Sequence, residues 1–263
     1  MTENANPLVR LDVADAVATV TLDRPQKMNA LTPQMIEDLL RIADEIEADR
    51  EVRCVILSAN GEKAFCVGAD INEWAALEPL DMWRRWVRRG HQVFDRWARL
   101  RVPVIAAING HALGGGLELA AVADIRIACA QATFALPEAS IATCPGWSGT
   151  QRLAALVGAS RVKYLALTGI RIDAREAWRL GIVHECLDDV AQVRSRASEI
   201  ATGICKLAPI STQLTKQIID AGEGAGLASA LEMMAGALAA TTEDAREGIA
   251  SFQQKRAPSY RGK

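Results

Sequence analysis

Residues Pro103–Ala128, "PVIAAINGHALGGGLELAAVADIRIA", contain the pattern that decides the fold. An apolar run typical of a buried strand leads through three consecutive glycines into a short helical pattern, and a second strand-like run, "ADIRIACA", follows. Upstream, a helical pattern that begins at Thr32-Pro33 precedes the apolar run "VRCVILSA", residues 52–59. This alternation predicts an α/β core with a largely parallel sheet that is buried on both faces.

The flanking segments extend this prediction to the whole chain. Residues 9–23, "VRLDVADAVATVTLD", alternate like a hairpin, and residues 81–97, "DMWRRWVRRGHQVFDRW", have helical spacing. Residues 60–74 are expected to form a loop. Helical patterns dominate after Gly149, with "GIVHECL" (residues 181–187) as a strand. We therefore expect a core over residues 1–200 and a helical region over residues 201–263.

Composition narrows the class of protein. Half of the 263 residues are hydrophobic and the formal net charge is -2, which does not favour nucleic acid or an anionic membrane as partner. The six cysteines have no paired spacing, which indicates reduced thiols and a cytoplasmic location. No secretory or transit signal and no membrane-spanning run is expected. The three histidines lack metal-ligand spacing, so no metal is expected.

The glycine run Gly114–Gly116 matches neither a P-loop nor a dinucleotide fingerprint. Its glycines could expose backbone N–H groups to an oxyanion, or they could only allow close packing of a helix on a strand. Glu118 follows within an apolar helix, where burying a carboxylate is costly unless it has a role or a partner. The alternative is that Glu118 lies on an exposed face.

Two further stretches carry candidate site residues. Glu138 follows Pro137 at the end of the apolar run "TFAL", where it could be functional or an ordinary loop acid. If Glu118 and Glu138 meet, burial and repulsion would raise one pKa and supply an acid and a base. The turn in "FCVGADINEW", residues 65–74, has no function that spacing reveals. Ser148 in "GWSGT" is expected to cap a helix.

Taken in order, these segments resemble the crotonase family, also called the enoyl-CoA hydratase/isomerase superfamily. The resemblance covers nearly the whole chain. It implies a spiral of ββα units with a helical C-terminal trimerisation region, assembled as a homotrimer or homohexamer. The segments that carry it, besides residues 103–128, are "LDRPQKMNAL" (22–31), "FCVGADI" (65–71), "FALPEASIATCPGWSGTQRL" (134–153), "ALTGIRIDAREAWRLGIV" (166–183) and "EGIASFQQKR" (247–256).

The resemblance also implies roles for individual residues. The backbone N–H groups of Ala69 and Gly115 would form an oxyanion hole for a thioester, and Glu118 and Glu138 would flank a water. This implies an enoyl-CoA hydratase of fatty acid β-oxidation, a lyase that needs no cofactor beyond the coenzyme A of its substrate. The substrate-binding residues would be Lys27, Gly68, Asp70, Ile71, Gly114 and Trp147, with Arg24 and Lys255 as further candidates for the ADP phosphates.

Departures from the family pattern keep alternatives open. Trp147 stands where the family commonly has a small residue, and Val67 replaces another. Carnitinyl-CoA dehydration or enoyl-CoA isomerisation on the same scaffold remains an alternative, as does a non-catalytic or RNA-binding protein. The stretch "WRRWVRR" mixes aromatic and basic residues as an RNA surface might, but its spacing places both tryptophans on one helical face with Met82 and Val87. This favours a packed helix with Trp83 or Trp86 at the acyl site.

Overall fold

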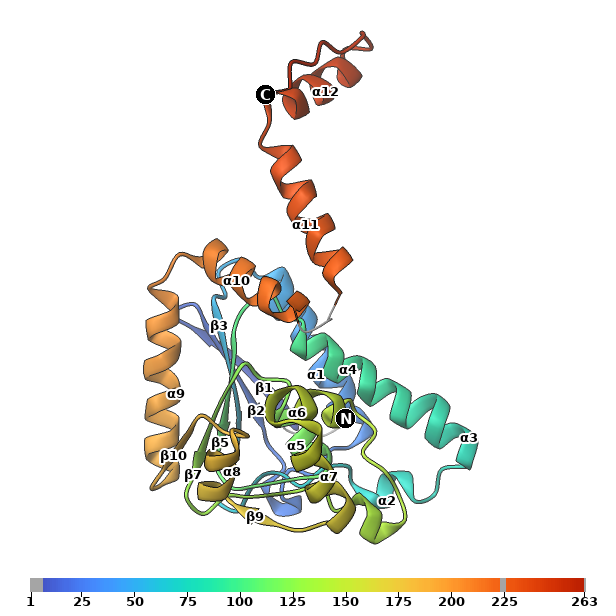
Figure 1. The fold of residues 1–263 in the computed structure, drawn as a ribbon, viewed down its shortest axis with the longest axis vertical. Helices are drawn as coiled ribbons and strands as arrows, with labels where there is room; N and C mark the ends of the chain where they lie inside the picture. The colour runs from blue at the N-terminus through green and yellow to red at the C-terminus, as the bar shows by residue number, and fades with distance from the viewer. Residues whose placement is uncertain (1–6, 223–225, 263) are drawn as a thin grey trace, which may run out of the picture. The chain divides into compact units, whose positions relative to one another are not determined.

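The computed structural model describes residues 7–222 and 226–262. The chain forms two compact units, residues 1–213 and residues 214–263. The expected boundary at residue 200 lies within helix α9 (Val190–Cys205), which packs against five strands of the main sheet (Figure 1). The assignment of residues 201–263 to oligomerisation stays a prediction.

The main sheet of the first unit has six strands in the order β1-β2-β3-β5-β7-β10. The expected hairpin pairs β1 with β2 in antiparallel register, and every other neighbouring pair is parallel. The central strands β3 and β5 are almost entirely buried, as their continuous apolar runs predict. The strands are β1 (Val9–Ala14), β2 (Val17–Leu22), β3 (Cys54–Ala59), β5 (Val104–Ile108), β7 (Ile125–Cys129) and β10 (Glu185–Leu187).

A second sheet of four short strands, in the order β4-β6-β8-β9, explains the spiral. Strands β4, β6 and β8 each follow a strand of the main sheet, so the chain alternates between the two sheets before each helix. This confirms the α/β class and the ββα spiral. The four strands are β4 (Ala64–Cys66), β6 (His111–Leu113), β8 (Thr133–Ala135) and β9 (Ile172–Asp173).

The prediction of a loop over residues 60–74 is wrong in part, because β4 and a short helix, α2 (Ile71–Trp74), lie within it. Strand β4 is only three residues long, and its glycine-flanked sequence gives no alternating pattern. It becomes a strand because it pairs with β6, a contact between residues far apart in the sequence. Asp70 caps α2 by accepting from the backbone N–H of Asn72 at 3.1 Å.

Helices α1 (Pro33–Ala48) and α4 (Arg88–Ala98) pack against one another beside the main sheet (Figure 1). As predicted, Thr32 caps α1, because its hydroxyl accepts from the N–H of Met35 at 3.2 Å. The indole Nε1 of Trp97 on α4 donates to the carbonyl of Leu39 at 2.9 Å, which ties the two helices together.

The segment before α4 is a π-helix, η2 (Met82–Val87), preceded by one turn, α3 (Pro79–Asp81). The wider π turn changes which residues share a face. Trp86 is buried, but Trp83 is 64% exposed, so the prediction that both tryptophans lie on the packed face is wrong for Trp83.

Helices dominate the rest of the chain, as the spacing predicts. In the second unit, α11 (Leu227–Ala240) and α12 (Glu243–Gln253) expose large apolar side chains, including Leu238 and Phe252. The other helices are η1 (Pro25–Lys27), α5 (Gly115–Ala120), η3 (Glu138–Ile141), α6 (Gly149–Val157), α7 (Ala159–Thr168), α8 (Ala174–Leu180), α10 (Pro209–Gly222), α11 (Leu227–Ala240) and α12 (Glu243–Gln253).

Candidate active site

The glycine run serves two purposes at different residues. Gly114 has φ +52°, and a Cβ placed on it would lie 2.9 Å from Oε1 of Glu138. A Cβ on Gly116 would instead lie 1.9 Å from the carbonyl oxygen of Cys66. Gly116 therefore allows close packing of α5 on β4, while Gly114 brings bare backbone next to a carboxylate. The interpretation of close packing is confirmed at Gly116, and the exposure of N–H groups to an oxyanion stays a prediction.

Two backbone N–H groups border a cavity where the glycine run meets the loop after β4. Gly68 has φ +93°, and a Cβ on it would lie 3.0 Å from the nitrogen of Gly115, so the two loops are in contact. Hydrogen bonds from Leu31 to Gly68 and from Asp70 to Leu31 fix the loop on either side of Ala69. Within residues 7–222 and 226–262, the N–H groups of Ala69 and Gly115 have no protein acceptor, and both residues line the cavity. They can therefore donate to a ligand oxygen.

Glu118 lies on α5 and is 2% exposed, so the alternative of an exposed face is wrong. Its Oε1 accepts from the backbone N–H groups of Trp147 and Gly149, both at 2.9 Å. Burial raises the pKa of Glu118, while the N–H groups of Gly149, Trp147 and Gly146 oppose that shift by stabilising the charged form. A Cβ on Gly149 would lie 2.1 Å from Cγ of Glu118, so only glycine lets this loop approach the carboxylate.

Glu138 begins η3 and is 9% exposed. Its Oε2 is buried and, among the described residues, has no hydrogen-bond partner. Burial, and to a smaller extent the charge of Glu118, raises the pKa of Glu138 to about 7. The two glutamates therefore influence one another, and they differ because three backbone N–H groups, those of Gly146, Trp147 and Gly149, stabilise the anion of Glu118, whereas the anion of Glu138 is stabilised by its own backbone N–H.

The cavity that both glutamates line has a volume of about 220 Å³. It contains most of the residues that the sequence predicted for the site. Its other walls include Trp74 on α2, Met82, Trp86 and Val87 on η2, and Thr143 and Cys144 in the loop before α6. The predicted residues that line it are Gly68, Ala69, Ile71, Gly114, Gly115, Glu118, Glu138 and Trp147.

Asp70 and Lys27 do not line the cavity. The carboxylate of Asp70 is buried and accepts from Nη1 of Arg24 at 2.7 Å, which holds its pKa below the usual value. Arg24 also donates to the carbonyl of Ala30 at 3.0 Å. This pair thus fixes the loop that carries Ala69. Lys27 is exposed on η1, and Lys255 is exposed in the second unit.

Sequence reasoning missed several residues that line the cavity. It also expected the hydroxyl of Ser148 to cap a helix, which the structure does not show. Met82 and Val87 belong to a helix some thirty residues before the glycine run, and only the packing of η2 brings them to the site. Ser148 occupies the N-cap position of α6, as predicted, but its hydroxyl makes no capping bond. Instead, its Oγ shares a hydrogen bond of 2.6 Å with Nδ1 of His91.

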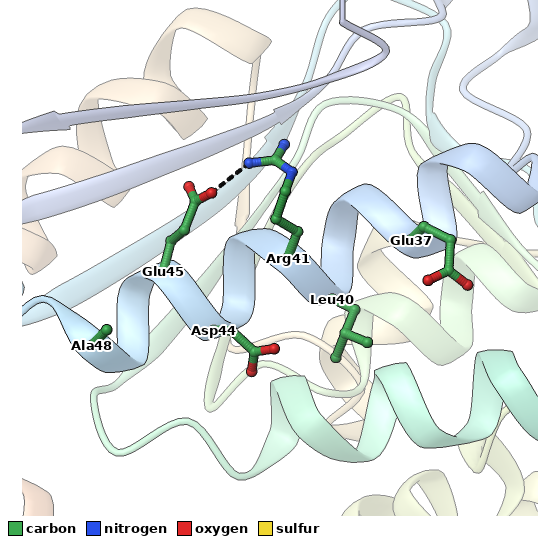
Figure 2. A pocket seen from close by; sticks show the side chains of 6 residues that line it. All are labelled: Glu37, Leu40, Arg41, Asp44, Glu45 and Ala48. Atoms are coloured by element: carbon green, nitrogen blue, oxygen red, sulfur yellow. Dashed lines mark hydrogen bonds and ion pairs between the residues drawn. The ribbon is translucent and has the colours of Figure 1, made fainter.

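A larger hollow of about 520 Å³ lies along α1 (Figure 2). All six residues that line it come from this one helix, and their charges are paired at the surface. Arg41 binds Glu45 at 2.6 Å, and Asp44 accepts from Arg96 at 2.9 Å. Such paired surface charges are common in proteins and do not indicate a function. The smaller cavity is therefore the candidate active site. The described residues contain no group of three or more His, Cys, Asp or Glu side chains that could hold a metal ion.

Comparisons with known proteins agree with this geometry. Residues 12–263 match the sequence profile of the enoyl-CoA hydratase/isomerase family. The short-chain-enoyl-CoA hydratase of Clostridium acetobutylicum is 40% identical over 250 residues, covering 94% of this chain and 95% of that protein. The (E)-benzylidenesuccinyl-CoA hydratase of Thauera aromatica is 37% identical, covering 97% of this chain and 99% of its own.

The fold has a close counterpart among solved structures. The crystal structure of an enoyl-CoA hydratase from Bacillus anthracis superimposes with a TM-score of 0.81 at 38% identity, covering 97% of this chain and 100% of the other. The chain belongs to the enoyl-CoA hydratase/isomerase family, which confirms the resemblance to the crotonase superfamily.

Proposed function

We propose that this protein is an enoyl-CoA hydratase that adds water reversibly to a trans-2-enoyl-CoA and gives the 3-hydroxyacyl-CoA. One observation carries the proposal: two buried carboxylates line a single cavity beside two backbone N–H groups that have no acceptor among the described residues. Family membership and relatives named as hydratases support the same reaction.

In this mechanism the N–H groups of Ala69 and Gly115 receive the thioester oxygen. Water adds to the β-carbon only if the enolate charge that develops on this oxygen is stabilised, and one such donor is worth about 3 kcal/mol. Both donors are fixed by the folded loops, so they need little reorganisation during the reaction. Coenzyme A takes part only as a portion of the substrate.

The two glutamates move the protons. Glu118 takes a proton from water as the water oxygen bonds to the β-carbon, and protonated Glu138 gives a proton to the α-carbon. The hydrogen bonds from Trp147 and Gly149 stabilise the anion of Glu118, which suits a base. Glu138 has no such donor at Oε2 and a pKa raised to about 7, which suits an acid. Proton exchange with solvent then restores both groups.

Hydration of crotonyl-CoA by Glu118→Gln and Glu138→Gln variants tests this proposal. Each substitution keeps the shape of the side chain but removes its acid or base function, so kcat should fall by about 10² to 10⁴. Calorimetry with butyryl-CoA should show retained binding. Near-normal turnover by either variant would contradict the mechanism. A wild type that prefers carnitinyl-CoA or a 3-enoyl-CoA would replace hydration by another reaction of the family.

The cellular compartment, the pathway and the oligomeric state of the protein also belong to this proposal. We place the enzyme in the cytoplasm and in fatty acid β-oxidation, and the six free cysteines suit a reducing compartment. None of the described helices is long and apolar enough to cross a membrane. We also propose a homotrimer or homohexamer, because α11 and α12 expose large apolar side chains that a second copy would cover: Leu231, Met233, Leu238, Ile249 and Phe252.

A further inference from the structure

We infer that Trp147 closes the acyl end of the cavity and restricts the enzyme to short, straight acyl chains. This inference rests on the proposed function, because it concerns the substrate of the same site. The indole of Trp147 is the feature that departs from the family pattern, and the structure shows how the protein accommodates it.

Trp147 belongs to a rigid aromatic cluster behind the cavity. It is 3% exposed, and its ring centroid lies 5.3 Å from that of Trp86 and 5.2 Å from that of Phe94. Tilted and edge-to-face contacts at such distances are favourable. Because Phe94 is fully buried on α4, the indole cannot move outward without disrupting the core. The wall that it forms is therefore fixed.

Two glycines make room for the indole. A Cβ on Gly90 of α4 would lie 2.1 Å from Nε1 of Trp147, and a Cβ on Gly115 would lie 2.8 Å from its Cε3 and Cζ3 atoms. The indole thus lies directly against the backbone of α4 on one side and against a proposed oxyanion donor on the other. No space remains between these backbones for a substrate tail.

The volume of the cavity favours a short acyl chain. Pockets for drug-sized ligands usually measure about 300 to 1,000 Å³, whereas this cavity measures about 220 Å³. A cavity below that range, with a fixed indole as one wall, favours a short acyl chain over a long one.

Chain-length preference in a Trp147→Ala variant tests this inference. The substitution removes the indole but keeps the backbone N–H that binds Glu118. The wild type should hydrate crotonyl-CoA at least tenfold more efficiently than 2-decenoyl-CoA, measured as kcat/KM. In the variant, this ratio should fall at least tenfold. Trp147→Leu, which leaves a smaller void, should change the ratio in the same direction and provides a second variant if the alanine protein does not fold.

Trp83→Ala is the matched control, because Trp83 lies on the π-helix η2 near Trp86 but is exposed and does not line the cavity. It should leave the ratio unchanged. A wild type that hydrates the decenoyl substrate as well as the crotonyl substrate, or a ratio unchanged in both Trp147 variants, would overturn the inference.

Binding separates this inference from the proposed function. Affinities for butyryl-CoA and decanoyl-CoA, measured by calorimetry, report the acyl pocket even if no enoyl-CoA is turned over. A preference for butyryl-CoA that Trp147→Ala abolishes would support the closed pocket, while absent turnover would contradict only the hydratase proposal. Equal affinities in the wild type would overturn the closed pocket even if hydration is observed.

Discussion

The backbone N–H of Trp147 donates to Oε1 of Glu118 at 2.9 Å, so the residue whose side chain walls the cavity also orients one of its two carboxylates. The neighbouring N–H of Gly149 binds the same oxygen. The loop before α6 therefore acts on both the shape of the pocket and the charge of Glu118. Changes to this loop should affect specificity and rate together.

The pH profile should reveal the state of Glu138. Hydration uses its protonated form, and its pKa is raised to about 7, so kcat/KM for hydration should fall as the pH rises through that value. Dehydration starts from the isomeric state with the proton on Glu118, and because the reaction takes up no net proton, its kcat/KM must change with pH in the same proportion. Initial rates of hydration across this range measure the effect. A kcat/KM for hydration that stays constant or rises through that value would contradict the assignment of the acid.

Gly68→Ala should damage the oxyanion hole. The new Cβ would lie 3.0 Å from the nitrogen of Gly115 in a backbone with φ +93°, so the loop must shift away from its donor position. We expect kcat to fall by about 10² or more. Gly158→Ala is the control, since Gly158 has a similar φ of +85° and open space around its Cβ position. It should lower stability by about 1 to 3 kcal/mol, the cost of holding a non-glycine residue in a sparsely populated backbone conformation, and leave kcat intact. Equal effects on kcat in both variants would contradict the prediction.

Arg24 and Lys27 should give opposite kinetic signatures. Arg24→Met leaves the buried carboxylate of Asp70 without its guanidinium partner, which loosens the loop of Ala69 and should lower kcat several-fold. Lys27 is exposed, so Lys27→Met should raise KM for the acyl-CoA without changing kcat if this side chain meets the phosphates. Steady-state kinetics with crotonyl-CoA distinguish the two. A pure KM effect in Arg24→Met would make it a phosphate ligand instead.

Assembly should depend on the apolar side chains of the C-terminal helices. Phe252 is 86% exposed on α12, and Leu238 is 71% exposed on α11. Replacing either by Asp places a charge where a second copy would pack, so the trimer or hexamer should dissociate. Light scattering after size-exclusion chromatography measures the mass. Gln253→Asp, which changes the neighbour of Phe252, is the control and should leave the mass unchanged. A monomeric wild type would contradict the proposed assembly.

Much of the fold could be predicted from the sequence, because the hairpin, α1 and the buried strands β3 and β5 have clear periodicity and caps. Strands β4 and β6 could not, since each is three residues long and forms only through pairing with a distant segment. The helical face predicted for Trp83 was also wrong. The prediction assumed the residue spacing of an α-helix, whereas residues 82–87 form a π-helix with a different periodicity.

The site was predicted unevenly for similar reasons. Glu118 was identifiable because a carboxylate in an apolar helix is costly to bury. The meeting of Glu118 and Glu138 required a resemblance to a family, because twenty residues of sequence contain no information about their distance. Asp70 was placed at the substrate on the same resemblance, yet its carboxylate is paired with Arg24 and does not line the cavity. A motif position does not reveal which way its side chain turns.

The contact between Gly149 and Glu118 limits how this scaffold can be engineered. Any side chain at position 149 would occupy the space of the glutamate stem, since its Cβ would lie 2.1 Å from Cγ. A library that varies position 149 alone should therefore displace Glu118, the proposed base, in every clone that does not keep glycine. Position 149 can therefore accept a side chain only if Glu118 is replaced at the same time. Such a double variant lacks the carboxylate proposed as the base of hydration.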